Sequence, residues 1–374
     1  MSRMRSGLSN NGRAYRCGKC VPIPTKVISP NINDNKVFII RLMDVATFDN
    51  NSNQWKLNND LIIPDGITFT IPPGATVNQN GKQITNNGVI NIYGTLIGFA
   101  TIINNGIINN YSNTIQMEHG CIFTNNKTIN NCKNAVITNN AGELHNQMDA
   151  TITNFLGATI NNHNQLVNNG TFTNQMEASI NNNKNGIFTN NKGTINNNGS
   201  FYNNLEAQFV NGVINSNSNS NSSTINNENK FFNAGTVINN YIFNNKSTSI
   251  MENSATGIIQ NNNKINIQNI LNNSGSIVNN KSGAINNLIK GAVINNLDKG
   301  HIVNGGTIVN KTDAIINNNI GATISNNINA SINNHIGSAI NNYGDIINND
   351  KRDIIIPSRN NLKNIVVKEK LKVK

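Results

Sequence analysis

Residues 106–110 read Gly106-Ile107-Ile108-Asn109-Asn110, and variants of this pentapeptide recur along most of the chain. The shared pattern is a small residue, any residue, a large apolar residue, any residue and an asparagine. Successive copies usually lie seven or eight positions apart. Clear copies are ATINN (158–162), GTFTN (170–174), ASINN (178–182), GIFTN (186–190), GTINN (193–197) and GAINN (283–287). A short repeat of this kind indicates a repeat architecture rather than a globular domain.

Within each copy the pattern has a period of two. In a β-strand, alternate side chains face the same side, so the small residue, the large apolar residue and the asparagine all point one way. A helix would need apolar residues three and four positions apart, which this chain does not supply. Asn-Asn and Asn-Gly steps then interrupt each strand. The sequence therefore predicts many short strands, although an Asn-rich chain can also be disordered.

A strand of five residues cannot bury its apolar face alone, but identical strands stacked about 4.8 Å apart can. We expect an apolar core column that includes Ile108, Ile160, Phe172, Ile180, Phe188, Ile195, Ile285, Ile316, Ile324 and Ile332. An unpaired buried amide costs about 1–3 kcal/mol, so each inward asparagine needs an amide above and below it. The predicted asparagine ladder includes Asn110, Asn162, Asn174, Asn182, Asn190, Asn197, Asn287, Asn318, Asn326 and Asn334.

These features predict an all-β fold, a single-stranded parallel β-helix or β-solenoid. We expect a right-handed coil of about three short strands and about 21–24 residues. Two strands per coil would give a thinner, longer rod. The uneven spacing of the repeats suggests sides of unequal length.

The repeat divides the chain into four segments. Residues 1–30 are basic and predicted to be disordered, and residues 31–77, which contain the only tryptophan, Trp55, are predicted to cap the solenoid. Residues 78–350 form the Asn-rich body, in which 215–223 (NSNSNSNSS) should loop out. Residues 351–374 are predicted to form a C-terminal cap and basic tail. Caps are expected because an exposed terminal coil would pair with other chains.

Charge is concentrated at the two ends. The formal net charge is +11, of which residues 1–30 and 351–374 each carry +6, whereas residues 31–350 sum to −1. Basic ends of this kind can bind other particle or surface proteins, promote self-association, or simply be solvated. Nucleic acid is a less favoured partner because the body carries no basic stripe.

The four cysteines predict no cofactor or metal site. Cys17 and Cys20 form a lone CxxC, and a structural zinc site needs four ligands. Cys121 and Cys132 lie within the repeats, where packed or turn positions are expected.

The sequence shows no apolar run typical of a signal peptide or a membrane span. We therefore expect a protein of the host-cell cytoplasm or of a virion, with no membrane span.

The segment Ile63–Val77 resembles the opening coil of adhesin-like β-helices of bacteria. The body as a whole resembles the Asn-rich repeat proteins of giant DNA viruses. The resemblance covers about residues 63–350 and implies a β-solenoid fold. It implies little about function, since unrelated proteins share such repeats.

Candidate catalytic groups are scattered. Glycoside hydrolysis usually needs two neighbouring carboxylates, and no acids here look paired at the expected coil spacing. Between Gly66 and Gly344 the acids are Asp149, Asp298, Asp313, Glu118, Glu143, Glu177, Glu206, Glu228 and Glu252. The histidines are expected to replace turn asparagines: His119, His145, His163, His301 and His335. The sequence thus favours a non-enzyme with no catalytic residues.

Three functional hypotheses follow. The first is a structural or fibre-like component of a virion or surface. The second is an adhesin-type module that binds glycans through outward Asn and Thr arrays. The third is a β-helix enzyme that acts on polysaccharides. An ice-binding face is less favoured because regular outward Thr-x-Thr rows are missing from the sequence pattern.

Overall fold

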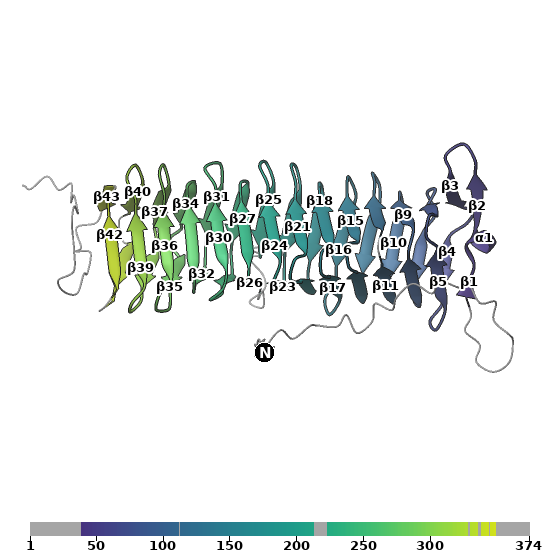
Figure 1. The fold of residues 1–374 in the computed structure, drawn as a ribbon, viewed down its shortest axis with the longest axis horizontal. Helices are drawn as coiled ribbons and strands as arrows, with labels where there is room; N and C mark the ends of the chain where they lie inside the picture. Colours follow the sequence, from purple (N-terminus) through teal and green to yellow (C-terminus); the bar gives the residue numbers. More distant parts are fainter. Residues whose placement is uncertain are drawn as a thin grey trace, which may run out of the picture. The chain divides into compact units, whose positions relative to one another are not determined.

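The computed structural model describes residues 39–111, 113–212, 223–327, 330–335, 338–343 and 345–348. These residues wind into about 13 stacked coils, each with three strands, one in each of three parallel sheets (Figure 1). The predicted all-β solenoid with three strands per coil is therefore confirmed. The expected loop 215–223, except for Ser223, lies outside the described residues, as do residues 1–30 and 351–374.

Sheet A receives the first strand of each coil, and every neighbouring pair in it is parallel. Its strands are β1 (Ile39–Ile40), β5 (Thr68–Ile71), β8 (Val89–Ile92), β11 (Ile107–Asn110), β14 (Thr128–Asn131), β17 (Thr151–Asn154), β20 (Thr171–Asn174), β23 (Thr194–Asn197), β26 (Thr224–Asn227), β29 (Ile242–Asn245), β32 (Lys264–Ile267), β35 (Ala284–Asn287), β38 (Thr307–Asn310) and β41 (Ser331–Asn334).

Sheet B receives the second strand and also holds an antiparallel hairpin at its N-terminal end. Its strands are β2 (Ala46–Asp49), β3 (Gln54–Leu57), β6 (Thr76–Asn78), β9 (Thr95–Gly98), β12 (Thr114–Met117), β15 (Val136–Asn139), β18 (Thr159–Asn162), β21 (Ser179–Asn182), β24 (Ser200–Asn203), β27 (Lys230–Asn233), β30 (Ile250–Asn253), β33 (Ile270–Asn273), β36 (Val293–Asn296), β39 (Ile315–Asn318) and β42 (Ala339–Asn342).

Sheet C receives the third strand. Its strands are β4 (Leu61–Ile63), β7 (Ile84–Asn86), β10 (Thr101–Asn104), β13 (Ile122–Asn125), β16 (Glu143–Asn146), β19 (Gln165–Asn168), β22 (Ile187–Asn190), β25 (Gln208–Asn211), β28 (Thr236–Asn239), β31 (Ile258–Asn261), β34 (Ser276–Asn279), β37 (His301–Asn304), β40 (Thr323–Asn326) and β43 (Asp345–Asn348).

The corners, not the strands, account for the uneven repeat spacing. Nearly every strand of the coils has four residues, so the expectation of unequal sides is wrong. Two residues, Asn169 and Gly170, separate β19 from β20, whereas the four residues 175–178 separate β20 from β21. At this particular corner only glycine fits position 170, since a Cβ there would lie 2.2 Å from the carbonyl oxygen of Ala150.

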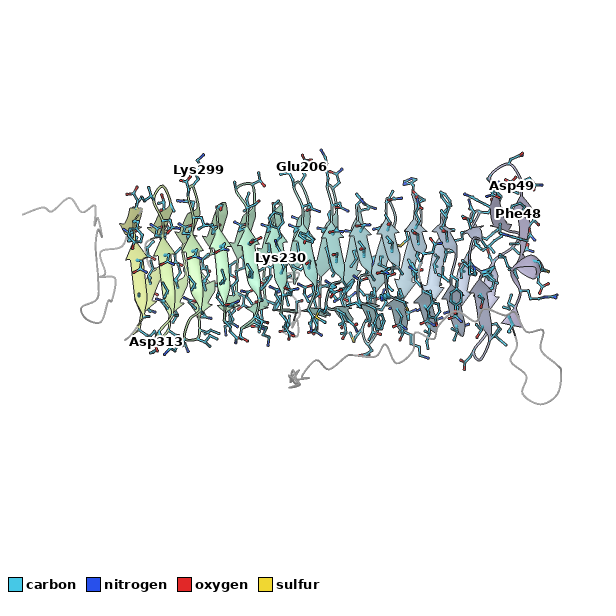
Figure 2. The ribbon with its side chains drawn as sticks, in the orientation of Figure 1. Phe48, Asp49, Glu206, Lys230, Lys299 and Asp313 are labelled. Carbon is cyan, nitrogen blue, oxygen red and sulfur yellow. The ribbon has the colours of Figure 1, made fainter. Side chains whose placement is uncertain are left out.

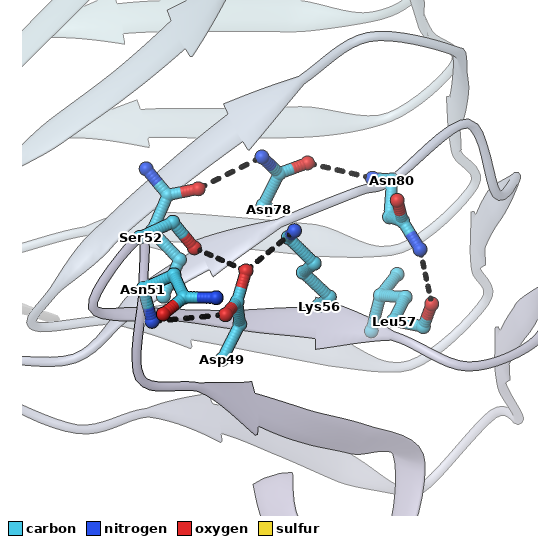
Figure 3. Close-up of polar contacts among 8 residues, drawn as sticks. Asp49, Asn51, Ser52, Lys56, Leu57, Asn78 and Asn80 are labelled. Carbon is cyan, nitrogen blue, oxygen red and sulfur yellow. Dashed lines mark hydrogen bonds and ion pairs between the residues drawn. The ribbon is translucent and has the colours of Figure 1, made fainter.

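The N-terminal end of the stack differs from the coils. The four-residue helix α1 (Leu42–Val45) precedes the hairpin β2–β3, and β3 then pairs in parallel with β6. Asp49 accepts from Lys56 at 2.6 Å, which lowers the pKa of Asp49 to about 2 (Figure 3). The Asn78 Nδ2 donates to Gln54 Oε1 at 2.9 Å and so ties the hairpin to β6. This hairpin lies in the segment predicted as the N-terminal cap, as do the parallel strands β4 and β5 and all of β6 except Asn78.

Inside each coil, the second and fourth residues of a strand are buried and the first and third face outward. The second residue is a large apolar side chain, and each one buried contributes about 1.5–3 kcal/mol. The small residue before the strand is also buried, as Ala158 and Ala178 show. This is the inward arrangement that the pentapeptide pattern predicts.

The fourth residue forms the asparagine ladders. Asn174 Oδ1 accepts from Asn154 Nδ2 of the coil before, and Asn174 Nδ2 donates to Asn197 Oδ1 of the coil after, both at 2.8 Å. The same Nδ2 also lies 3.2 and 3.1 Å from the backbone oxygens of Ala178 and Ser200. One amide therefore bonds two neighbouring amides and the corner that follows its strand. The three sheets repeat this arrangement, with Nδ2 always donating towards the C-terminal end.

Each ladder begins after a coil in which an apolar residue takes the asparagine position. Ile63, Ile92 and Ile267 precede Asn86, Asn110 and Asn287, and in these three asparagines the buried Oδ1 has no hydrogen-bond partner. The ladder of sheet B begins at Asn139, whose Oδ1 accepts from the Gly142 backbone N–H at 2.9 Å. Each ladder is thus a chain of aligned amides. The Oδ1 of its first asparagine receives no hydrogen bond from another ladder amide.

Candidate functional site

The residues predicted from the repeat all lie where coils stack. The side chains of nine of the ten ladder asparagines are buried, and that of Asn334 is not described. All ten residues of the predicted core column are buried as well. They form three columns rather than one, because each sheet contributes its own. Sheet A holds Ile108, Phe172, Ile195, Ile285 and Ile332, sheet B holds Ile160, Ile180 and Ile316, and sheet C holds Phe188 and Ile324.

Most carboxylates of the described coils lie in corners between strands, as Figure 2 shows for Glu206 and Asp313. Asp149, Glu177, Glu206 and Asp313 all have positive φ, between 61° and 64°. A residue in this left-handed conformation costs about 1–2 kcal/mol unless it is glycine, and short polar side chains tolerate it best. Glu206 forms an exposed ion pair with Lys184 at 2.8 Å. These four acids are solvated turn residues.

A group of titratable residues nevertheless meets at the corner between sheets B and C. Three successive coils bring together Glu118, His119, Glu143, His145 and His163. Beside them lies a surface groove of ≈ 570 Å³. Its lining is His119, Gly120, Cys121, Ile122, Asn140, Ala141, Gly142, Glu143, His163, Asn164 and Asn185. We call this the corner groove.

Hydrogen bonds hold the groups of the corner groove in place. His145 Nε2 lies 2.9 Å from Glu143 Oε2, and both side chains face outward from β16. Asn140 Nδ2 donates to Glu118 Oε1 at 2.7 Å. Asn183 Nδ2 lies 3.1 Å from His163 Nε2. If this nitrogen is the acceptor, a neutral His163 carries its proton on Nδ1. The groove thus offers imidazole, carboxylate and amide groups to a polar ligand.

The cysteine beneath the groove is not a nucleophile. Cys121 is buried, and burial together with the nearby Glu118 carboxylate raises the pKa of its thiol to about 12. Cys132, at the corner after sheet A, is also buried, with its pKa raised to about 12. Only the thiolate is strongly nucleophilic, so both thiols are inert near neutral pH. Both residues are packed in the repeats, as predicted, whereas Cys17 and Cys20 lie outside the described residues.

The histidine prediction is correct for three of five residues. His119, His163 and His335 lie in corners, but His145 and His301 are the third and first residues of strands and face outward. In the described part of the chain, no three His, Cys, Asp or Glu side chains gather in a way that could hold a metal ion. The only helix there is α1, and no described helix is long and apolar enough to cross a membrane.

The sequence did not predict the corner groove because the number of residues in each corner, and therefore in each coil, was unknown. Glu118 and Asn140 are 22 residues apart, and His163 and Asn183 are 20 apart. Both separations are one coil. A search for chemical groups one coil apart, allowing for corners of two to five residues, would have found them.

The outward strand positions carry regular polar arrays. On sheet A, Thr residues occupy the first position of five successive strands: Thr128, Thr151, Thr171, Thr194 and Thr224. Beside them, outward asparagines form further ladders, such as Asn226 to Asn196 and Asn244 to Asn226, each at 3.0 Å. These outer amides donate towards the N-terminal end, opposite to the inner ladders. The faces therefore present amide and hydroxyl groups at each coil.

No protein-family model and no curated protein matches this sequence. Among solved structures, the chain is similar to a crystal structure of a fragment of TibA that was hyper-glycosylated by TibC. The identity is 13%, the match covers 83% of this chain and 93% of the fragment, and the TM-score is 0.23. A TM-score this low supports no inference about function.

Proposed function

We propose that this protein is a non-enzymatic structural rod that holds a fixed length and surface pattern. The observation that carries this proposal is the continuity of the inner ladder in sheet C. It runs from Asn86 through every coil to Asn326, with each Nδ2 donating to the next Oδ1 at 2.7–2.9 Å. Each of these hydrogen bonds contributes about 1 kcal/mol net to the stability of the fold. Each coil is therefore stabilised by the coils before and after it.

The same ladder supports the view that the length of the rod is its functional property. Each coil adds one step of about 4.8 Å and the same set of bonds, so length scales with coil number. Among the inward isoleucines of the C-terminal coils lies a small apolar void of ≈ 20 Å³. A spacer needs neither a cavity nor a catalytic group.

We place this rod in an assembly, either a virion or a cell surface. The support is the resemblance of the repeat to the Asn-rich proteins of giant DNA viruses and to bacterial surface proteins. The partners would be other particle or surface proteins, and the basic segments 1–30 and 351–374 are the candidate attachment points.

Mass spectrometry of purified particles, compared with the remaining cell fraction, tests the assembly role. We expect enrichment with particles and its loss when residues 351–374 are deleted. Absence from particles would overturn the virion proposal. The rod itself is tested by deleting one coil, residues 155–174. The purified protein seen by electron microscopy should then be shorter by about 4.8 Å, and its circular-dichroism spectrum should remain that of a β-sheet protein.

Glycan binding is the second candidate function, and the corner groove is the observation that favours it. Carboxylate, imidazole and amide groups there suit the hydroxyl groups of a sugar. A glycan array with the whole protein tests this function, and no binding to any glycan would remove it.

The enzymatic hypothesis has less support. Glu118 and Glu143 both lie at the corner groove, but Glu118 is bonded to amides and Glu143 to His145. A turnover assay on polysaccharides, with release of reducing ends as the readout, would reveal such an activity.

A further inference from the structure

The outward amide ladder of sheet B is interrupted in the middle of the molecule. Asn181 bonds to Asn161 at 2.9 Å on one side of the interruption. On the other side, Asn295 donates to Asn272 at 2.9 Å, and the ladder continues to Asn317 and Asn341. The three rungs between Asn181 and Asn272 are not amides. Their residues, in register along the stack, are Tyr202, Phe232 and Glu252.

The two rings form a half-exposed platform on the strand face. The centroids of Tyr202 and Phe232 are 6.1 Å apart, and the ring planes are tilted by 55°. Lys230, two residues before Phe232, places its Nζ 5.8 Å from the centroid of that ring. It also forms an ion pair with Glu252 at 3.0 Å, and both charged side chains remain more than one-third exposed. Figure 2 shows Lys230 on the strand face at mid-length of the rod.

The other aromatic rings of the coils either face inward or lie at corners, where Phe99 and Tyr343 are exposed. Tyr93 and Tyr111 stack face to face at a corner, 4.6 Å apart with a 7° angle, so each ring hides one face of the other. Burial raises the pKa of Tyr111 to about 12. The phenylalanines at inward strand positions are fully buried. Among the described strands β4 to β43, Tyr202 and Phe232 are the only aromatic residues at outward positions.

We propose that the Tyr202–Phe232 platform binds a pyranose ring of a neutral polysaccharide. A sugar presents an apolar C–H face and a polar rim of hydroxyl groups. The two rings match the face, because an aromatic side chain gives large contact area at small entropic cost. Glu252, Lys230 and the flanking amides of Asn181 and Asn272 match the rim with acceptors and donors. This inference rests on the second candidate function, glycan binding.

The alternative role of the two rings is a purely structural one, in which they pack neighbouring coils together. Cross-strand aromatic pairs contribute only about 0.2–1 kcal/mol, so the rings are not needed to hold the coils together. Amides at both rungs would instead extend the ladder that ends at Asn181. The double variant Tyr202→Asn/Phe232→Asn therefore removes the platform with a replacement that suits the fold. This gives a test in which loss of binding is separated from loss of structure.

The experiment is affinity electrophoresis of the full chain through gels that contain laminarin, galactomannan or dextran. We expect at least one polysaccharide to retard the wild-type chain. The double variant should lose at least tenfold in affinity and keep its circular-dichroism spectrum and melting temperature. Phe99→Asn, which removes an exposed corner phenylalanine, serves as the matched control and should bind like the wild type.

Two other outcomes would overturn the inference in different ways. If the wild type is retarded and the double variant is retarded equally, the platform is not the site but glycan binding stands. If none of the three polysaccharides retards the wild type, the proposed ligand class is wrong. A negative glycan array would then remove the second candidate function itself.

Discussion

Two stretches of the solenoid share one backbone framework but fill it differently. From β20 to β29, six inward phenylalanines pack with centroid separations of 4.9–5.8 Å. From β35 to β43, all nine inward residues of the second strand position are isoleucine. A narrow void of ≈ 20 Å³ runs between these isoleucines and their neighbours Leu271 and Ile277. We call the two stretches the phenylalanine segment and the isoleucine segment.

This comparison indicates that the asparagine ladders, and not the inward apolar side chains, determine the geometry of the coil. In both segments the inner ladder bonds from Asn Nδ2 to Asn Oδ1 measure 2.8 Å, whether phenylalanine or isoleucine stands beside them. The apolar side chains then determine packing density. An apolar void of this size stays dry, so its walls simply lose contacts.

The largest effect is expected from removing a ring in the phenylalanine segment. Phe231 lies 5.0 Å from Phe201 and 4.9 Å from Phe243 between ring centroids. Phe231→Ala should lower the free energy of unfolding by about 3–5 kcal/mol, since large-to-small core changes leave a cavity. Ile316→Ala in the isoleucine segment should cost about 2 kcal/mol, because its surroundings are already loosely packed. Urea denaturation measures both values.

Hydrogen exchange with mass spectrometry locates the Phe231→Ala effect, because each coil of a solenoid contacts mainly its neighbours. Faster exchange should appear in peptides from β24 to β30. Phe232→Ala, at the next position but facing outward, is the matched control and should cost less than about 1.5 kcal/mol. Equal losses for Phe231→Ala and Ile316→Ala would show that the two segments are packed alike.

The next effect concerns the ladder that both segments share. Asn174→Leu removes the donor to Asn197 Oδ1 and the acceptor for Asn154 Nδ2. We expect a loss of about 3 kcal/mol, from one orphaned buried acceptor and the lost bonds. Asn318→Leu in the isoleucine segment should cost the same, because Asn318 has the same pair of ladder bonds.

Thermal unfolding of the two variants, followed by circular dichroism, compares them directly. Thr173→Leu, which changes the outward neighbour of Asn174, controls for an added leucine and should be within about 0.5 kcal/mol of the wild type. A much smaller loss for Asn318→Leu would mean that the ladder weakens towards the C-terminal end.

The sequence was sufficient for the strand pattern because its period of two is local. Every copy such as 178–182 places Ile180 and Asn182 on one face, and stacking then requires asparagine to follow asparagine. What depends on corner geometry could not be predicted. Most corners have two to five residues, and their lengths decide which side chains lie one coil apart. The corner groove and the Tyr202–Phe232 platform therefore emerged only from the structure. Ladder starts such as Asn287 follow from a single missing amide that the repeat pattern does not mark.

A smaller effect of opposite sign in the two segments tests the packing argument. Ile316→Phe fills the void of the isoleucine segment and should raise the free energy of unfolding by up to about 1 kcal/mol. Ile195→Phe inserts the same ring among Phe201 and Phe209 and should lower it by about 1–3 kcal/mol. Melting temperatures measured at one scan rate give the signs. A loss in both variants would indicate that the void cannot accept a ring.

The smallest effect is expected where an isoleucine interrupts the ladder between the two segments. Ile267 occupies the asparagine position of β32, so Asn287 Oδ1 has no partner and the ladder of sheet A stops at Asn245. Ile267→Asn should let the new amide accept from Asn245 and donate to Asn287. Satisfying that acceptor gains about 1–3 kcal/mol, and losing the buried isoleucine costs about 1.5–3 kcal/mol. We therefore expect a net change within about 1 kcal/mol.

Ile265→Asn, two residues earlier in the same strand, provides the contrast. Ile265 is also fully buried, but its neighbours along the stack are Phe243 and Ile285, which offer no hydrogen bond. That amide would stay unpaired in an apolar column, so the cost should exceed the cost of Ile267→Asn by about 3 kcal/mol. Urea denaturation of the two variants gives the difference. Equal costs would mean that an inward amide gains nothing from amides above and below it, and the ladder would then be a consequence of the coil rather than its cause.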